Sequence, residues 1–132
     1  MGVRPVKYTV CVDFDGVLHT YDGRYEGDHI AEGLPIEGAI GWLFEAVQHF
    51  EVVILTTRGG SWRGRRAIRR WLRKHSGDIF YDGPGYRGIK DVKITNRKPP
   101  ALMYIDDRAV RFTGEYWPNP REVHRARPWW KT

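Results

Sequence analysis

Two pairs of aspartates stand out in this 132-residue chain, because each pair directly follows an apolar run. The pairs are Asp13 with Asp15, and Asp106 with Asp107. Unpaired carboxylates at the ends of buried strands are costly, so four of them together need a counter-charge. A hard cation with oxygen ligands, Mg²⁺, meets that need simply. The residue types therefore predict a Mg²⁺ site, although either pair alone could be an acidic turn or a helix cap.

Other polar residues also flank apolar runs. Thr56 and Arg58 follow the run EVVIL at residues 51–55, and Lys98 precedes the run that ends at Asp106. A threonine hydroxyl and a backbone N–H at a strand end can together hold a phosphate oxygen. Taken singly, Thr56 is an ordinary strand-to-helix junction and Lys98 a solvated turn residue. Their order along the chain (acid pair, Thr, Lys, acid pair) is what favours a shared site.

The hydropathy pattern predicts elements that could bring these residues together. Buried strands are predicted at residues 6–12, 51–55 and 101–105, and a short strand at 92–95. One helix is predicted to open at Pro35 and another to run from the cap Ser61 to about His75. The polar segment 19–33 is predicted to be a mobile loop. Strands that alternate with helices form parallel sheets, in which ligands bind at the carboxyl ends of the strands. We therefore predict a single α/β domain over residues 1–132, a three-layer Rossmannoid with a mostly parallel central sheet.

The ordered set of motifs resembles the haloacid dehalogenase superfamily of phosphatases over residues 6–112. DFDGVL at 13–18 is similar to the first motif of that family, ILTTR at 54–58 to the strand that ends in threonine, Lys98 to the lysine of the third motif, and YIDD at 104–107 to the fourth. The short interval between Lys98 and Asp106 is most similar to the small nucleotidase-like branch. Lys93 and Lys90 are the alternatives for the site lysine. The segments after the first motif and after Thr56 are too short for a full cap domain.

This resemblance implies a Mg²⁺-dependent phosphomonoester hydrolase that works through an aspartyl-phosphate. Asp13 would be the nucleophile, and Asp15 the general acid and then the base. The ligands of Mg²⁺ would be Asp13, the backbone carbonyl of Asp15, and Asp106, with Asp107 as a further or outer-shell ligand. Thr56 and Lys98 would stabilise the oxygens of the transferring phosphoryl group.

The net charge of +6 is concentrated in one segment. Residues 61–75 hold seven basic and no acidic residues, and the rest of the chain has 15 basic against 16 acidic residues. A basic helix that begins beside the threonine motif favours anionic ligands. The predicted substrate is therefore a nucleotide or a phosphorylated nucleic-acid end, contacted by Arg58 and Arg63 in an open, capless site.

Two other functions fit the same residues. In a phosphatase of a small metabolite or a phosphoprotein, the basic segment would be only a solvated helix face. In a non-catalytic nucleic-acid-binding module of the same fold, the basic segment would carry the function.

The remaining composition bears on the compartment. The single cysteine, Cys11, excludes a disulfide within the chain, and no apolar run approaches the ~20 residues that span a bilayer. We therefore expect a cytoplasmic protein.

Overall fold

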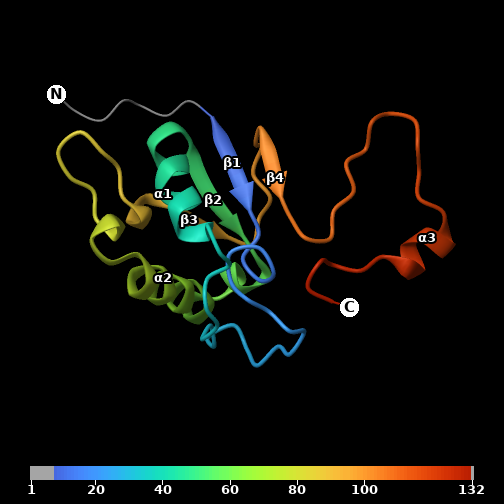
Figure 1. Ribbon diagram of the computed structural model, residues 1–132, viewed down its shortest axis with the longest axis horizontal. Helices are drawn as coiled ribbons and strands as arrows, with labels where there is room; N and C mark the ends of the chain where they lie inside the picture. The colour runs from blue at the N-terminus through green and yellow to red at the C-terminus, as the bar shows by residue number, and fades with distance from the viewer. Residues whose placement is uncertain (1–7, 132) are drawn as a thin grey trace.

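A four-stranded parallel sheet lies at the centre of the structure, a computed structural model that describes residues 8–131 (Figure 1). The strands are β1 (Thr9–Val12), β2 (Glu51–Leu55), β3 (Lys93–Thr95) and β4 (Met103–Ile105), in the order β3-β2-β1-β4. Val12 lies opposite Ile54 of β2 on one side and Ile105 of β4 on the other. The carboxyl ends of these three strands therefore lie side by side. Residues 6 and 7 of the predicted first strand lie outside the described residues.

Two helices, α1 (Ala39–His49) and α2 (Trp62–Ser76), pack against this sheet and complete the α/β fold that the sequence predicts, without a full cap domain. The short helix α3 (Pro120–Arg125) follows β4, and there are 3₁₀ turns at η1 (Thr57–Gly60), η2 (Gly77–Phe80) and η3 (Ile89–Asp91). Both α1 and α2 bury apolar residues in one core cluster with strand residues such as Val12 and Ile54. That shared core fixes the two helices relative to the carboxyl ends of the strands.

The basic helix α2 begins and ends where its sequence indicates. The hydroxyl of Ser61 accepts the backbone N–H of Gly64 at 3.0 Å, and Gly77 follows the last turn. Ile68, Trp71 and Leu72 form the expected buried stripe, but Trp62 is 63% exposed and does not extend it. The helix therefore packs against the protein through a narrow apolar face, and most of its arginines are exposed.

Two predicted elements differ from the structure. The first helix begins at Ala39 rather than Pro35, because the backbone N–H of Ile36 bonds to the carbonyl of Leu18 and Gly38 adopts a left-handed conformation with φ of 85°. The last strand is not buried as predicted, since Met103 is 57% exposed on β4. β4 is the edge strand, so only β1 covers one of its sides.

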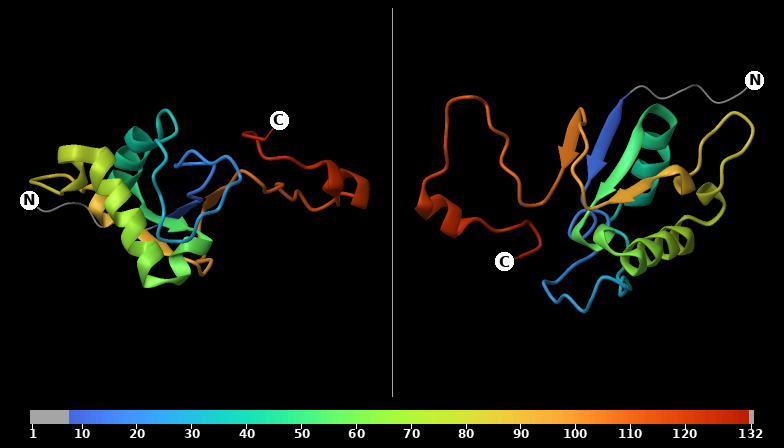
Figure 2. Two further views of the ribbon diagram at one scale, coloured as in Figure 1. Left: turned by 90° about the horizontal axis from the view of Figure 1, so that it is seen from below. Right: turned by 180° about the vertical axis from the view of Figure 1, so that it is seen from behind.

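Beyond β4 the chain leaves the body of the protein. Residues 108–127, which include α3, form an arm in which every residue except Pro118 is exposed. Figure 2 shows this arm running away from the sheet before the C-terminal residues return towards it. Among residues 8–131, no helix is both long and apolar enough to cross a membrane.

The packing of α2 against η1 gives a first prediction, because Gly64 sits where a side chain cannot fit. A Cβ there would collide with the carbonyl oxygen of Arg58, whereas a Cβ at Gly41 of α1 would meet nothing within 4 Å. Gly64→Ala should therefore lower the free energy of unfolding by about 1–3 kcal/mol. Gly41→Ala should raise it by about 0.5–1 kcal/mol through helix propensity. Urea denaturation measures both, and equal effects of the same sign would contradict this packing.

Candidate functional site

Three carboxylates meet at the carboxyl ends of two neighbouring strands. Asp13 directly follows β1, and Asp106 and Asp107 directly follow β4. The backbone N–H of Asp13 extends the strand pairing to the carbonyl of Ile105 at 2.9 Å. One carboxylate oxygen from each aspartate lies within 4.8 Å of the other two. The sheet register thus brings together three of the four aspartates that the sequence singles out.

The crowding of these carboxylates changes the acidity of Asp13. The pKa of Asp13 is raised to about 7, mainly by burial and also by the charges of Asp106 and Asp107, against a backbone hydrogen bond from Phe14 that lowers it. Like charges brought together in a partly buried place disfavour ionisation in this way. A cation bound among them would remove the penalty, so the electrostatics of the site fit a metal ion.

The geometry also fits Mg²⁺. Mg²⁺ binds carboxylate oxygens at about 2.0–2.1 Å in an octahedron, so neighbouring ligand oxygens lie about 3 Å apart and opposite ones about 4.2 Å apart. One carboxylate oxygen from each of the three residues lies within 4.8 Å of the other two, which is somewhat wider than these separations. Asp13, Asp106 and Asp107 could therefore hold one divalent cation between them after small side-chain movements.

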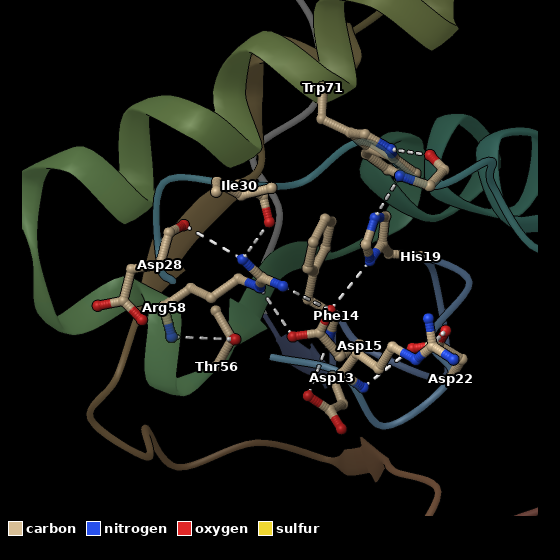
Figure 3. Close-up of polar contacts among 12 residues, drawn as sticks. Asp13, Phe14, Asp15, His19, Asp22, Asp28, Ile30, Thr56, Arg58 and Trp71 are labelled. Atoms are coloured by element: carbon tan, nitrogen blue, oxygen red, sulfur yellow. Dashed lines mark hydrogen bonds and ion pairs between the residues drawn. The ribbon is translucent and has the colours of Figure 1, made fainter. Parts of the chain in front are cut away.

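The side chain of Asp15 lies outside this group, contrary to the prediction that the spacing of Asp13 and Asp15 lets both carboxylates converge. Its oxygens accept from Arg58, at 2.8 Å from Nε and 3.1 Å from Nη2, and from His19 Nδ1 at 2.9 Å (Figure 3). The chain leaves the sheet at Phe14, whose carbonyl accepts the backbone N–H groups of Leu18 and His19. This tight turn directs Asp15 away from Asp13.

Arg58 has an internal role and does not present itself to a substrate as predicted. Its side chain is only 2% exposed, and its guanidinium forms an ion pair with Asp15. Nη1 also donates to the carbonyl oxygens of Gly27 and Ile30, at 2.9 and 2.7 Å. Arg58 thus fastens the loop predicted to be mobile, residues 19–33, to the strand end.

A chain of hydrogen bonds continues from Asp15 into the core. His19 Nδ1 donates to Asp15, and Nε2 accepts the backbone N–H of Gly33 at 2.9 Å, which requires the neutral Nδ1–H tautomer. The indole of Trp71 donates to the carbonyl of Gly33 at 2.7 Å. Burial alone would raise the pKa of Asp15, but the hydrogen bonds from His19 and Arg58 and the charge of Arg58 lower it below its usual value.

The other predicted phosphate ligands are partly in place. Thr56 follows β2 at the same edge of the sheet, is buried, and accepts the backbone N–H of Arg58 at 3.3 Å. Lys98 is exposed, with Nζ 4.5 Å from the ring centroid of Tyr104. Its side chain therefore lies against β4 rather than among the three carboxylates.

The alternative lysines lie elsewhere. Lys93 stands at the start of β3, where Nζ pairs with Glu51 at 2.5 Å. Lys90 precedes that strand and pairs with Asp82 at 3.3 Å. Lys90 thus comes before β3 and Lys93 begins it, so of the three candidates only Lys98 follows its carboxyl end.

Arg63 belongs to an exposed stripe on α2 and not to the carboxylate group. This basic stripe consists of Arg63, Arg66, Arg70 and Lys74, all exposed. Other arginines of the helix bond to the protein itself, as Arg69 does to the carbonyls of Lys90 and Val92. Some basic residues of α2 therefore stabilise the fold, and those of the basic stripe are accessible to a binding partner.

Sequence reasoning missed His19 and the two C-terminal tryptophans. His19 lies four residues after Asp15, a spacing that carries little information by itself. Trp129 Nε1 donates to the carbonyl of Gly16, and Trp130 Nε1 donates to Asp107 Oδ2, both at 2.6 Å. The two pairs are 113 and 23 positions apart, and no local pattern connects them, so these contacts come only from the three-dimensional structure.

Comparison of the chain with protein-family models, with curated proteins and with solved structures gave no match.

The opposite environments of Asp13 and Asp15 predict opposite effects of the same substitution. At pH 8 both are ionised: the raised pKa of Asp13 means that its charge costs stability, and the lowered pKa of Asp15 means that its charge contributes stability. Without metal, Asp13→Asn should raise the melting temperature by several degrees, corresponding to roughly 1 kcal/mol, and Asp15→Asn should lower it. Calorimetry at pH 8 in EDTA tests this, and a destabilised Asp13→Asn would show that the carboxylates do not repel one another.

The fork of Arg58 predicts a second stability difference. Arg58→Lys keeps the positive charge, but a lysine cannot form two hydrogen bonds to Asp15 and also bond to the loop carbonyls. The substitution should therefore lower the free energy of unfolding by about 2–3 kcal/mol. Arg63→Lys, on the exposed stripe, should stay within about 0.5 kcal/mol of the parent. Urea denaturation compares the two, and equal stability of the variants would contradict the internal role of Arg58.

Proposed function

We propose that this protein is a Mg²⁺-dependent phosphomonoester hydrolase that uses Asp13 as its nucleophile, as its resemblance to the haloacid dehalogenase superfamily implies. One observation carries the proposal: Asp13 shares the carboxyl end of adjacent strands with Asp106 and Asp107, within 4.8 Å. In parallel sheets this edge is where ligands bind. Bound Mg²⁺ would offset the repulsion between an anionic nucleophile and an anionic phosphate.

The reaction proceeds in two displacements at phosphorus. An Oδ of Asp13 attacks, the bond from phosphorus to the ester oxygen breaks, and the leaving alcohol takes up a proton. A water oxygen then attacks the phosphorus of the aspartyl-phosphate, gives up a proton, and releases phosphate with Asp13 restored. Each step conserves the phosphoryl group, and the sum is hydrolysis of the ester.

Asp15 is better suited to the second step than to the first in the observed geometry. Its ion pair with Arg58 keeps it ionised, so it can accept a proton from the attacking water. Donation to the leaving group requires a protonated Asp15, and the guanidinium opposes that state. The acid role therefore requires the pair with Arg58 to loosen when substrate binds.

Thr56 and Lys98 are the proposed ligands of the transferring oxygens. Thr56 already stands at the strand edge with its hydroxyl beside the backbone N–H of Arg58. Lys98 would have to leave the ring of Tyr104 to reach a phosphate, a movement that its exposed position permits.

The basic stripe on α2 supports a nucleotide or a phosphorylated nucleic-acid end as the substrate. Its four exposed cations could neutralise backbone phosphates while a terminal phosphate reaches Asp13. The same stripe also favours a second function, a nucleic-acid-binding module without catalysis. Such a module would bind oligonucleotide in a salt-dependent way with no turnover. Cys11, buried and unpaired, is consistent with our proposal of a cytoplasmic location.

The nucleophile is tested by substitution. Asp13→Asn should lower kcat on phosphorylated oligonucleotides and nucleotides by about 10³-fold or more, since no covalent intermediate can form. Asp22→Asn, in the exposed part of loop 19–33, should leave kcat unchanged and serves as the matched control. An Asp13→Asn protein that turns over at the parent rate would contradict the proposed mechanism.

Metal removal and salt test the rest of the proposal. Dialysis against EDTA should abolish hydrolysis, and Mg²⁺ should restore it. Replacing Arg63 and Arg70 with glutamine should raise KM for an oligonucleotide and flatten its salt dependence, with little change for a small phosphate ester. Equal effects on both substrates would assign the stripe no part in binding nucleic acid.

A further inference from the structure

The C-terminal end of the chain lies on the carboxylate site. After the exposed arm 108–127, Pro128 is buried and Trp130 is half-buried. Trp129 and Trp130 each donate an indole N–H to the site, to the carbonyl of Gly16 and to Asp107 Oδ2. Gly16 comes directly after Asp15 and Asp107 is one of the three grouped carboxylates, so both bonds reach residues of the proposed active site.

Packing holds the Trp130 ring as well as its N–H. Tyr21 meets it in a T-shaped contact with centroids 5.2 Å apart, and the guanidinium of Arg108 lies 5.6 Å from its centroid. A side chain at Gly16 would collide with both Trp130 and Asp107. The absence of a Cβ at Gly16 is therefore required for the tryptophan to reach the carboxylate.

Few contacts join residues 128–130 to the rest of the protein. Within the described part of the chain, the hydrogen bonds of residues 109–127 stay inside the arm. The two indole hydrogen bonds and the packing of the Trp130 ring on Tyr21 therefore join residues 128–130 to the strand ends.

The bond from Trp130 has a direct consequence for a cation at this site. By occupying Oδ2 of Asp107, the indole N–H fixes the rotation of the carboxylate and leaves Oδ1 for another ligand. It also places the positive end of a dipole among three like charges. Hydrogen bonds of this kind to ligating carboxylates typically change metal affinity by about 10–100-fold.

We propose that Trp130 is a positioning residue for the divalent cation. The inference rests on the proposed function in taking the three carboxylates to be a metal site. Trp130 lies outside the motifs DFDGVL, ILTTR and YIDD, so the motifs alone do not identify it.

Direct binding of Mn²⁺ to the full chain tests this without any activity measurement. Free Mn²⁺ is followed by electron paramagnetic resonance as protein is titrated, for the parent, Trp130→Phe, Trp129→Phe and Trp117→Phe. Trp130→Phe keeps an aromatic ring beside Tyr21 but loses the N–H. Trp117 lies in the arm, 75% exposed, and is the matched control.

We expect Trp130→Phe to raise the Kd for Mn²⁺ about tenfold or more, with the melting temperature in EDTA little changed. Trp129→Phe should raise the Kd less than threefold, because its bond goes to a backbone carbonyl, and Trp117→Phe should leave it unchanged. A Trp130→Phe protein that binds Mn²⁺ as tightly as the parent overturns the inference while leaving the metal site intact. So does an equal loss in Trp129→Phe, which would mean that docking, and not the bond to Asp107, matters.

Binding of Mn²⁺ to the parent protein distinguishes a failure of this inference from a failure of the proposed function. If the parent binds one Mn²⁺ and Asp106→Asn does not, the metal site stands and the tryptophan variants decide the role of Trp130. If the parent binds no Mn²⁺ at millimolar concentration, the metal site and the positioning role are both contradicted.

Discussion

Repulsion among three carboxylates at one edge of a parallel sheet is the constraint on which the rest of the structure depends. Asp13, Asp106 and Asp107 are neighbours because β1 and β4 pair in register and both end at that edge. Folding therefore concentrates negative charge that the unfolded chain keeps apart. Our proposal is that a divalent cation offsets this charge and that the site it forms carries out phosphate chemistry.

The carboxylate of Asp15, next to this group, differs from it because it has partners that offset its charge. Asp15 is only two residues from Asp13, yet its carboxylate is paired with Arg58 and His19, and the pKa values of the two aspartates move in opposite directions. Arg58 also holds the carbonyls of loop 19–33, so the compensated pair fixes the wall of the site. The partners of Asp15 thus hold its carboxylate in place, whereas the carboxylate of Asp13 faces two like charges.

The sequence predicts the strand ends well, because strands and their termini are local features. Buried β1 and β2, the cap at Ser61, and the meeting of Asp13 with Asp106 all follow from hydropathy, turn chemistry and the geometry of parallel sheets. The side-chain directions of Asp15, Arg58 and Lys98 do not follow, since they depend on a turn at Phe14, a loop 30 residues away and a stacking contact with Tyr104. The docking of Trp130 does not follow from local sequence either, because its ring packs on Tyr21, in a distant part of the sequence.

Anomalous diffraction from crystals grown with Mn²⁺ tests the central claim most directly. The account predicts one strong Mn²⁺ peak coordinated by carboxylate oxygens of Asp13, Asp106 and Asp107 at the carboxyl ends of β1 and β4. Crystals at saturating Mn²⁺ with no peak at that position, or with these carboxylates turned away from a cation bound elsewhere, would contradict it.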